Sequence, residues 1–131
     1  MCIRDSLCRY KDDRRSLPGL SLNNDGSFLT SVANDYGYEH AFSRQVEGLG
    51  NPGDVLVGIS TSGNSESVNR ALRAARDKGL ATIALLGWNG GAAAGISDVD
   101  IVVPCEETAR IQEVHGLLIH AFCEYIDATL F

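Results

Sequence analysis

The sequence is poor in several features that would assign it to a broad class. Its 131 residues include no apolar run long enough to cross a membrane. The N-terminal residues do not form the charged and then apolar segment that is typical of a secretion signal. Lys and Arg number 11 against 17 Asp and Glu, which gives a net charge of −6 and no basic excess for nucleic acid. We therefore expect one folded domain that binds neither a membrane nor nucleic acid.

Cysteine pairs and a dinucleotide-binding fingerprint are also missing. The four cysteines, Cys2, Cys8, Cys105 and Cys123, form no CxxC motif, which predicts reduced thiols in a cytoplasmic protein. No GxGxxG follows a strand, which argues against a Rossmann-type nucleotide domain. A small anionic ligand stays compatible with the acidic composition, because backbone amides can create a local positive field.

Apolar runs alternate with helical patterns in the second half of the chain. Runs that are apolar on both faces predict buried parallel strands, and the helical segments between them predict crossovers that cover the sheet. The predicted fold is therefore α/β, with right-handed crossovers and ligands at the carboxyl ends of the strands. The predicted strands are 55–59, 82–86 and 99–103, with a short one at 20–22; the predicted helices are 27–34, 38–49, 66–78 (ended by Gly79) and 106–129.

The run Ser60-Thr61-Ser62-Gly63-Asn64-Ser65 is the most informative motif. It joins a predicted strand to a predicted helix, where unpaired N–H groups and the helix dipole favour an anion. Its hydroxyls add donors, and Gly63 allows close approach of the backbone. The run is thus compatible with a phosphate site. The alternative is an ordinary turn in which Asn64 or Ser65 caps the helix.

Two polar residues, Gln112 and His120, lie on one ridge of the predicted C-terminal helix, with Gly116 between them. His120 has three open interpretations: a general base, a metal ligand or a hydrogen-bonded core histidine. The two residues are separated by roughly 12 Å of helix rise, unlike the compact HxxxH spacing of a zinc helix. Glycine within a helix costs about 1 kcal/mol relative to alanine, which suggests close packing or a ligand beside Gly116.

Several segments together resemble the sugar isomerase (SIS) domain and, within it, the phosphoheptose isomerases. The resemblance runs from about Arg9 to the C-terminus. It rests on the segments Ala33-Asn34-Asp35-Tyr36-Gly37-Tyr38, Gly53 to Ser65, Gly87 to Gly91, and Ala109-Arg110-Ile111-Gln112-Glu113-Val114-His115.

The resemblance implies an enzyme that converts sedoheptulose 7-phosphate to D-glycero-D-manno-heptose 7-phosphate, towards ADP-heptose and lipopolysaccharide core. The reaction is aldose–ketose isomerisation through an enediol, and the family uses zinc. By resemblance, Gln112 would contact substrate and ligate zinc, and His120 would ligate zinc and act as acid/base. Asn34 and Asp35 would contact sugar hydroxyls, and the phosphate would be bound by Ser60, Thr61, Ser62 and Ser65.

The resemblance also implies a cytoplasmic homotetramer with sites at subunit boundaries and a three-layer α/β/α fold of flavodoxin-like strand order. The chain departs from the family because the N-terminal third, with its first strand, GNGGS loop and a His and Glu that ligate zinc, is missing. We interpret residues 1–8 as extraneous and 9–131 as an incomplete SIS domain. Two strand edges would lose their partner, and half the zinc ligands would be absent. We therefore expect the fragment alone to be unstable, aggregation-prone or inactive.

A second hypothesis is a non-catalytic SIS module that binds a sugar phosphate or a protein partner, as the replication-initiator-associating proteins do. The presence of His120 and of the complete serine-rich run favours the enzyme, because a protein-binding module needs no general base. For Tyr36 and Trp88, packing is the favoured interpretation over a place in the pocket.

Overall fold

A computed structural model describes residues 2–131, which form two compact units. The larger unit is Leu22–Ile111, and the smaller one combines the residues up to Ser21 with Gln112–Phe131. The cysteines Cys8 and Cys105 are free thiols, as predicted. No helix among the described residues is long and apolar enough to cross a membrane.

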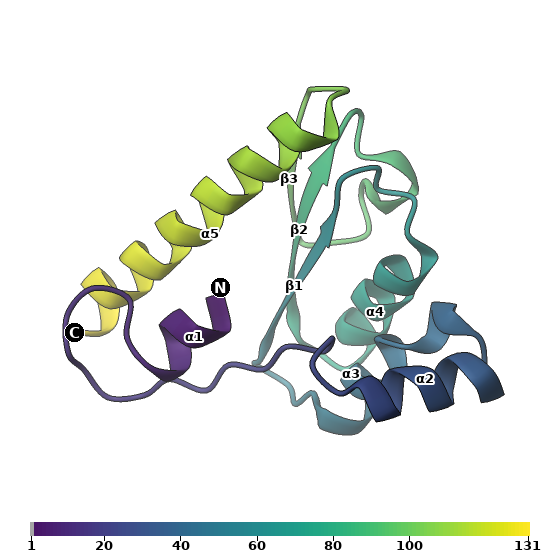
Figure 1. Ribbon diagram of the computed structural model, residues 1–131, viewed down its shortest axis with the longest axis horizontal. Helices are drawn as coiled ribbons and strands as arrows, with labels where there is room; N and C mark the ends of the chain where they lie inside the picture. Colours follow the sequence, from purple (N-terminus) through teal and green to yellow (C-terminus); the bar gives the residue numbers. More distant parts are fainter. Residues whose placement is uncertain (1) are drawn as a thin grey trace. The chain divides into compact units, whose positions relative to one another are not determined.

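The larger unit contains the predicted parallel sheet (Figure 1). Its strands are β1 (Val55–Ser60), β2 (Ala81–Gly87) and β3 (Val99–Val103), hydrogen-bonded in the order β1-β2-β3. The crossover from β1 to β2 is α4 (Glu66–Asp77), and η2 (Gly91–Ala93) lies between β2 and β3. Gly79, with φ of +78°, follows α4 and ends it. The three long predicted strands and the crossover helix are confirmed.

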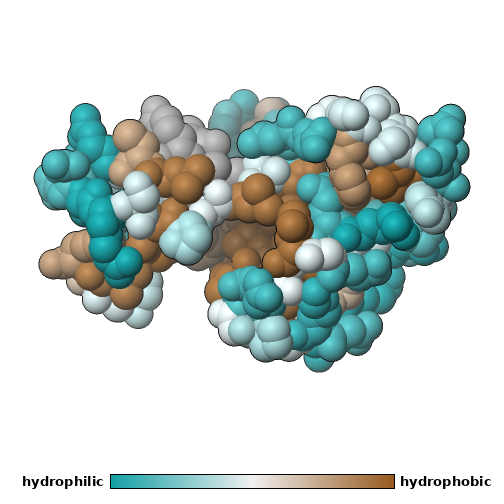
Figure 2. Space-filling view, turned by 90° about the horizontal axis from the view of Figure 1, so that it is seen from below, coloured by the Kyte–Doolittle hydropathy of each residue, from teal (hydrophilic) through white to brown (hydrophobic). Residues whose placement is uncertain are grey.

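The core of this unit lies between the sheet and α4. Leu72 of α4 and Ala84 and Leu86 of β2 are fully buried and pack together. The opposite side of β1 is more open: Val55, Val57 and Ile59 are 59%, 40% and 45% exposed. In the view of Figure 2, apolar side chains form part of the molecule's surface. The prediction of burial on both faces is therefore wrong for β1. Separately, β1 forms an edge of the described sheet, because β2 is its one neighbouring strand there.

Three short helices precede the sheet: α2 (Gly26–Asp35), η1 (Tyr38–His40) and α3 (Ser43–Leu49). Asp25 caps α2 by accepting a hydrogen bond of 3.0 Å from the N–H of Phe28. The single helix predicted over 38–49 is instead two, because the chain turns between them and packs Phe42 against the core around Val46 and α4.

The strand predicted at 20–22 is absent from this part of the described chain. Leu20 is 66% exposed, whereas Leu22 packs against the α3–α4 core. The Leu22 carbonyl accepts a hydrogen bond of 2.7 Å from Nε2 of Gln45. That carbonyl is therefore paired with a side chain rather than with a neighbouring strand, and three residues without a strand partner do not form a ladder.

The smaller unit consists of α1 (Cys2–Leu7), an irregular segment and most of α5 (Thr108–Leu130). The helix α1 lies where the sequence predicted no element, and the interpretation of residues 1–8 as extraneous stays a prediction; Met1 lies outside the described residues. Within the smaller unit, Arg14 links α1 to α5. Its guanidinium contacts Asp127 at 2.8 Å and the carbonyls of Asp5 and Ser6 at 2.6 and 2.9 Å.

Gly116 lies in the middle of α5. A Cβ atom added to Gly116 would have no atom within 4 Å among the described residues, so of the two alternatives, close packing or a ligand, close packing is not what the structure shows.

Candidate functional site

The serine-rich run forms a compact loop at the carboxyl end of β1. Ser60 is 5% exposed, and its Oγ accepts a hydrogen bond of 3.1 Å from the N–H of Gly63. The same Oγ lies 3.1 Å from Oγ of Ser65. Ser62 Oγ accepts from the N–H of Asn64 at 3.2 Å. The hydroxyls therefore fix the loop from within, while Ser62 and Ser65 remain exposed to solvent.

The loop after β2 holds the serine loop from the outside. Gly63 has φ of +67°, and a Cβ there would lie 1.9 Å from the carbonyl oxygen of Gly90. The carbonyl of Gly63 accepts from the N–H of Ala93 at 2.9 Å, and Oδ1 of Asn64 accepts from the N–H of Ala92 at 3.0 Å. A side chain at position 63 is excluded by backbone conformation and by space, so glycine is required for this packing.

The N-terminus of α4 opens directly beside these hydroxyls. Ser65 is its N-cap residue, but the side chain of Ser65 makes no capping hydrogen bond. The Glu66 carboxylate in the first turn accepts from Nε of Arg70 at 2.9 Å, an i,i+4 pair along the helix. The helix start thus combines exposed hydroxyls with the positive end of a helix dipole, an arrangement that suits a phosphate group. The predicted alternative of Asn64 or Ser65 as N-cap is thus confirmed for the position of Ser65, but not for a capping hydrogen bond from its side chain.

Asn34 and Asp35 do not join this loop. They are the last two residues of α2, both exposed, and Nδ2 of Asn34 donates to Oδ1 of Asp35 at 2.7 Å. In Figure 1, α2 lies at the bottom of the larger unit and the carboxyl ends of the strands lie at its top. Within this unit, the two predicted sugar contacts are therefore separated from the predicted phosphate contacts.

Gln112 and His120 belong to the smaller unit, on α5. His120 is half-buried, and its imidazole packs against the Tyr10 ring with centroids 5.8 Å apart and planes tilted by 36°. Gln112 is exposed. Among residues 2–131, no three His, Cys, Asp or Glu side chains gather closely enough to hold a metal. Gln112 and His120 supply two donors of the four that zinc usually takes, so the residues present do not fit a whole zinc site.

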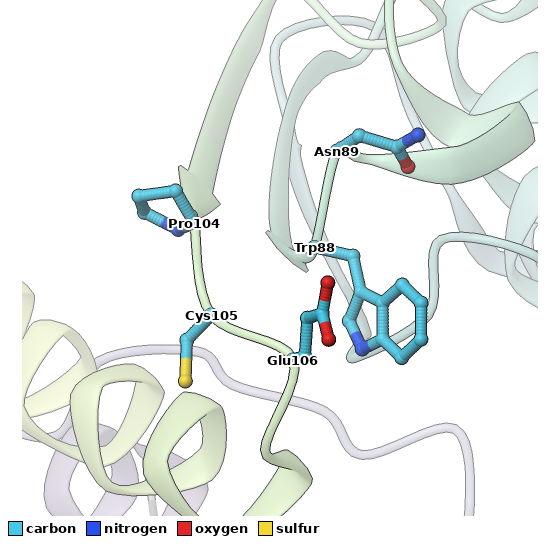
Figure 3. A pocket seen from close by; sticks show the side chains of 5 residues that line it. All are labelled: Trp88, Asn89, Pro104, Cys105 and Glu106. Atoms are coloured by element: carbon cyan, nitrogen blue, oxygen red, sulfur yellow. The ribbon is translucent and has the colours of Figure 1, made fainter.

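The sequence interpretation missed a pocket beside the serine loop. It lies where β2 and β3 end, has a volume of about 300 Å³ and includes the exposed face of Trp88. Trp88 is 51% exposed, so the prediction that it simply packs is wrong; Tyr36 is 55% exposed and stacks under Arg44 at 4.1 Å. No periodicity marks such residues, because the pocket joins two loops that are distant in sequence. The lining residues, shown in Figure 3, are Trp88, Asn89, Pro104, Cys105 and Glu106.

Comparison with known proteins gives a consistent result. Residues 9–87 match the model of the SIS domain family. A phosphoheptose isomerase of Geotalea daltonii is 52% identical over 129 residues, which is 98% of this chain and 67% of the relative. A phosphoheptose isomerase of Helicobacter pylori strain P12 is also 52% identical, over 91% of this chain and 62% of the relative. The chain thus spans between 62% and 67% of the length of these two relatives.

Solved structures agree with the sequence relatives. A phosphoheptose isomerase from Francisella tularensis superposes with a TM-score of 0.92 at 37% identity, covering 97% of this chain and 68% of that one. The enzyme from Neisseria gonorrhoeae gives a TM-score of 0.80 at 53% identity, over 82% and 61% of the two chains. These relatives carry the name of an enzyme, which favours the enzyme over the non-catalytic module. The α/β chain with its parallel β1-β2-β3 sheet belongs to the SIS domain family, among the phosphoheptose isomerases.

Proposed function

We propose that the chain carries the phosphate-binding and proton-transfer parts of an isomerase that converts sedoheptulose 7-phosphate to D-glycero-D-manno-heptose 7-phosphate. The observation that supports this most directly is the loop Ser60–Ser65, whose exposed hydroxyls stand at an uncapped helix start. Such a site suits a phosphate monoester without any lysine. The proposal places the protein in the cytoplasm, on the route to ADP-heptose and lipopolysaccharide core.

The loop residues divide into two roles in this proposal. Ser62, Ser65 and Thr61 donate to the phosphate oxygens, together with N–H groups of the first turn of α4. Ser60 is buried, and its hydroxyl is engaged with Gly63 and Ser65, so it chiefly holds the loop in shape. Glu66 does not oppose the anion strongly, because Arg70 pairs with its carboxylate.

His120 acts as the acid/base of the isomerisation in this proposal. An imidazole titrates near neutral pH and can remove the proton from the carbon beside the carbonyl, then return a proton to the neighbouring carbon. The Tyr10 ring beside the imidazole restricts its orientation. Gln112 contacts the substrate. Zinc remains a proposed cofactor for which Gln112 and His120 are two donors, and no proton-transfer step depends on it here.

The separation of Asn34 and Asp35 from the serine loop bears on assembly. Within one copy, α2 lies at the opposite end of the larger unit from that loop. If Asn34 and Asp35 contact the sugar of a bound substrate, they do so from another copy of the chain. We propose on this basis that each site is completed by a neighbouring subunit, in the homotetramer that the family resemblance implies.

The test is an isomerase assay with sedoheptulose 7-phosphate. The chain is assayed alone and fused to the part of the Geotalea daltonii relative that it does not span. We expect turnover from the fusion and little from the chain alone. In the fusion, His120→Ala abolishes turnover and leaves binding of inorganic phosphate unchanged. Undiminished turnover in that variant would remove His120 from the reaction, and absence of phosphate binding in the parent would reject the loop assignment.

A further inference from the structure

The pocket at the ends of β2 and β3 has the composition of a ligand site. Its volume of about 300 Å³ lies at the lower end of the range for small-molecule sites. One wall is aromatic and another carries a carboxylate. Figure 3 shows the Glu106 carboxylate beside the Trp88 ring, whereas the Cys105 thiol points away from that ring.

Trp88 is held in this position at a conformational cost. Its φ of 55° lies in the left-handed region, where a bulky side chain is rarely found. The N–H of Trp88 donates to the carbonyl of Cys105 at 3.2 Å, which joins the end of β2 to the segment after β3. An indole that is half exposed gains little from burial, so packing within the unit does not explain why it is held there. Strained residues of this kind concentrate where a ligand is bound.

The segment that contributes Trp88 and Asn89 to the pocket continues into glycines that pack against the serine loop. Trp88 and Asn89 lead directly into Gly90 and Gly91, and a Cβ at Gly91 would lie 2.4 Å from the carbonyl oxygen of Ser62. One loop therefore both lines the pocket, through Trp88 and Asn89, and packs against the serine loop, within the same compact unit. A ligand anchored by its phosphate at the serine loop has the pocket as its neighbour.

Glu106 decides which part of a ligand would enter. A carboxylate repels phosphate but accepts hydrogen bonds from hydroxyl groups, and charge-assisted hydrogen bonds are among the stronger ones. An indole face packs against the C–H groups of a polyol chain. From this geometry we propose that the Trp88–Glu106 pocket is a subsite for the hydroxyl-bearing carbon chain of a sugar phosphate, and that Trp88 and Glu106 determine its specificity. This inference rests on the proposed function.

Trp88 is the chain's only tryptophan, so intrinsic fluorescence reports directly on the pocket. The 131-residue chain is titrated with sedoheptulose 7-phosphate, with inorganic phosphate and with unphosphorylated sedoheptulose, and Kd is measured in parallel by calorimetry. We expect the sugar phosphate to change the emission of Trp88 and inorganic phosphate to bind without that change.

Two variants and a matched control sharpen the test. Glu106→Gln and Trp88→Gly should each weaken sugar-phosphate binding by about tenfold, the value of one good hydrogen bond or contact, and change the Kd of inorganic phosphate by less than about threefold. Trp88→Gly suits the left-handed backbone and so avoids a folding defect. Glu107→Gln removes the same charge one residue away, outside the pocket lining, and should leave both constants unchanged.

The outcomes separate the two proposals. If sedoheptulose 7-phosphate and inorganic phosphate both bind, and neither Glu106→Gln nor Trp88→Gly raises the Kd of the sugar phosphate, the subsite is overturned while the assignment of the serine loop to phosphate remains. If sedoheptulose changes the emission but inorganic phosphate does not bind, the subsite stands and the loop assignment falls. Binding of neither sugar rejects the subsite. A choline probe that binds more tightly than the sugar would make the pocket a cation site and overturn the inference.

Discussion

The two ends of the parallel sheet are fixed by different chemistry. At the carboxyl end of β1, neutral hydroxyls and a glycine hold the loop, through Ser60 and Gly63. At the amino end the turns are held by carboxylates. Asp98 accepts from the N–H and Oγ1 of Thr82, each at 2.8 Å, and Asp54 accepts from the N–H of Asn51 at 2.9 Å. Carboxylates in the serine loop would repel a phosphate, whereas at the amino end they stabilise turns without that conflict. The hydrogen bonds described for the serine loop, which is proposed for anion binding, thus involve hydroxyls and no carboxylate.

The strongest way to break the carboxyl end is Gly63→Ala. The new Cβ would lie 1.9 Å from the carbonyl oxygen of Gly90, and the alanine would have to adopt the left-handed φ of Gly63. We therefore expect the free energy of unfolding to fall by about 3 kcal/mol or more. Urea denaturation measures it. Gly48→Ala is the control, because a Cβ at Gly48, inside α3, has no atom within 4 Å. That variant should be neutral or stabilised by up to about 1 kcal/mol. Equal stability of the two variants would contradict the packing described for Gly63.

Removing the buried hydroxyl of Ser60 tests the internal support of the loop. Ser60→Ala leaves the N–H of Gly63 without its side-chain acceptor, and we expect a loss of about 1–2 kcal/mol. Ser62→Ala, at an exposed position, should change stability by less than about 0.5 kcal/mol and weaken binding of inorganic phosphate instead. Denaturation and phosphate titration of both variants provide the measurement. A reversed pattern would exchange the structural and binding roles of the two serines.

The stability contributed by the amino end of the sheet should depend on pH. The hydrogen bonds from the Thr82 hydroxyl and N–H hold the pKa of Asp98 below its usual range, with a smaller contribution from Arg76. A depressed folded-state pKa gives stability that is present above about pH 4 and is lost as the pH falls through the folded-state value. Asp98→Asn should therefore flatten the decline of stability below about pH 4. Thr82→Val, which removes the main donor, should flatten it too; an unchanged acid limb in both variants would refute the assignment.

The smallest effect is expected at Glu66. Its exposed pair with Arg70 contributes about 0.5 kcal/mol or less, so Glu66→Gln should barely change the unfolding free energy. Removing a negative charge near the start of α4 should tighten phosphate binding by about two- to threefold at low salt, and the gain should disappear at high salt. Titrations at two ionic strengths check this. Weaker phosphate binding in Glu66→Gln would place the anion elsewhere.

Much of the fold was predictable because its signals are local. The apolar runs that became β1, β2 and β3, and the stripe that buries Leu72, follow from side-chain periodicity. The strand at 20–22 failed for a non-local reason, since no strand is hydrogen-bonded to it and the Leu22 carbonyl is taken by Gln45. The helix over 38–49 failed because tertiary packing of Phe42 broke it.

The candidate site also has one part that the sequence predicts and one part that it does not. The hydroxyls of Ser60–Ser65 and the acid/base candidate His120 are visible as residue types in a pattern or as matches to family motifs. The pocket of Trp88 and Glu106 is not, because Glu106 has no periodic or motif signal and the motif segment Gly87 to Gly91 does not show what Trp88 lies beside. The roles of the serines also differ by burial, which no sequence pattern separates.

By itself the sequence determined the three long strands, the crossover helix between the first two and the position of an anion-compatible loop, because each of these has a local signal; the alternation of strands and helices then implied parallel pairing. Tertiary structure decided which hydroxyl is buried, that Asn34 and Asp35 lie away from that loop, and that Trp88 and Glu106 line one pocket. Those facts depend on how distant segments pack, and packing is set by the space that all the side chains fill together.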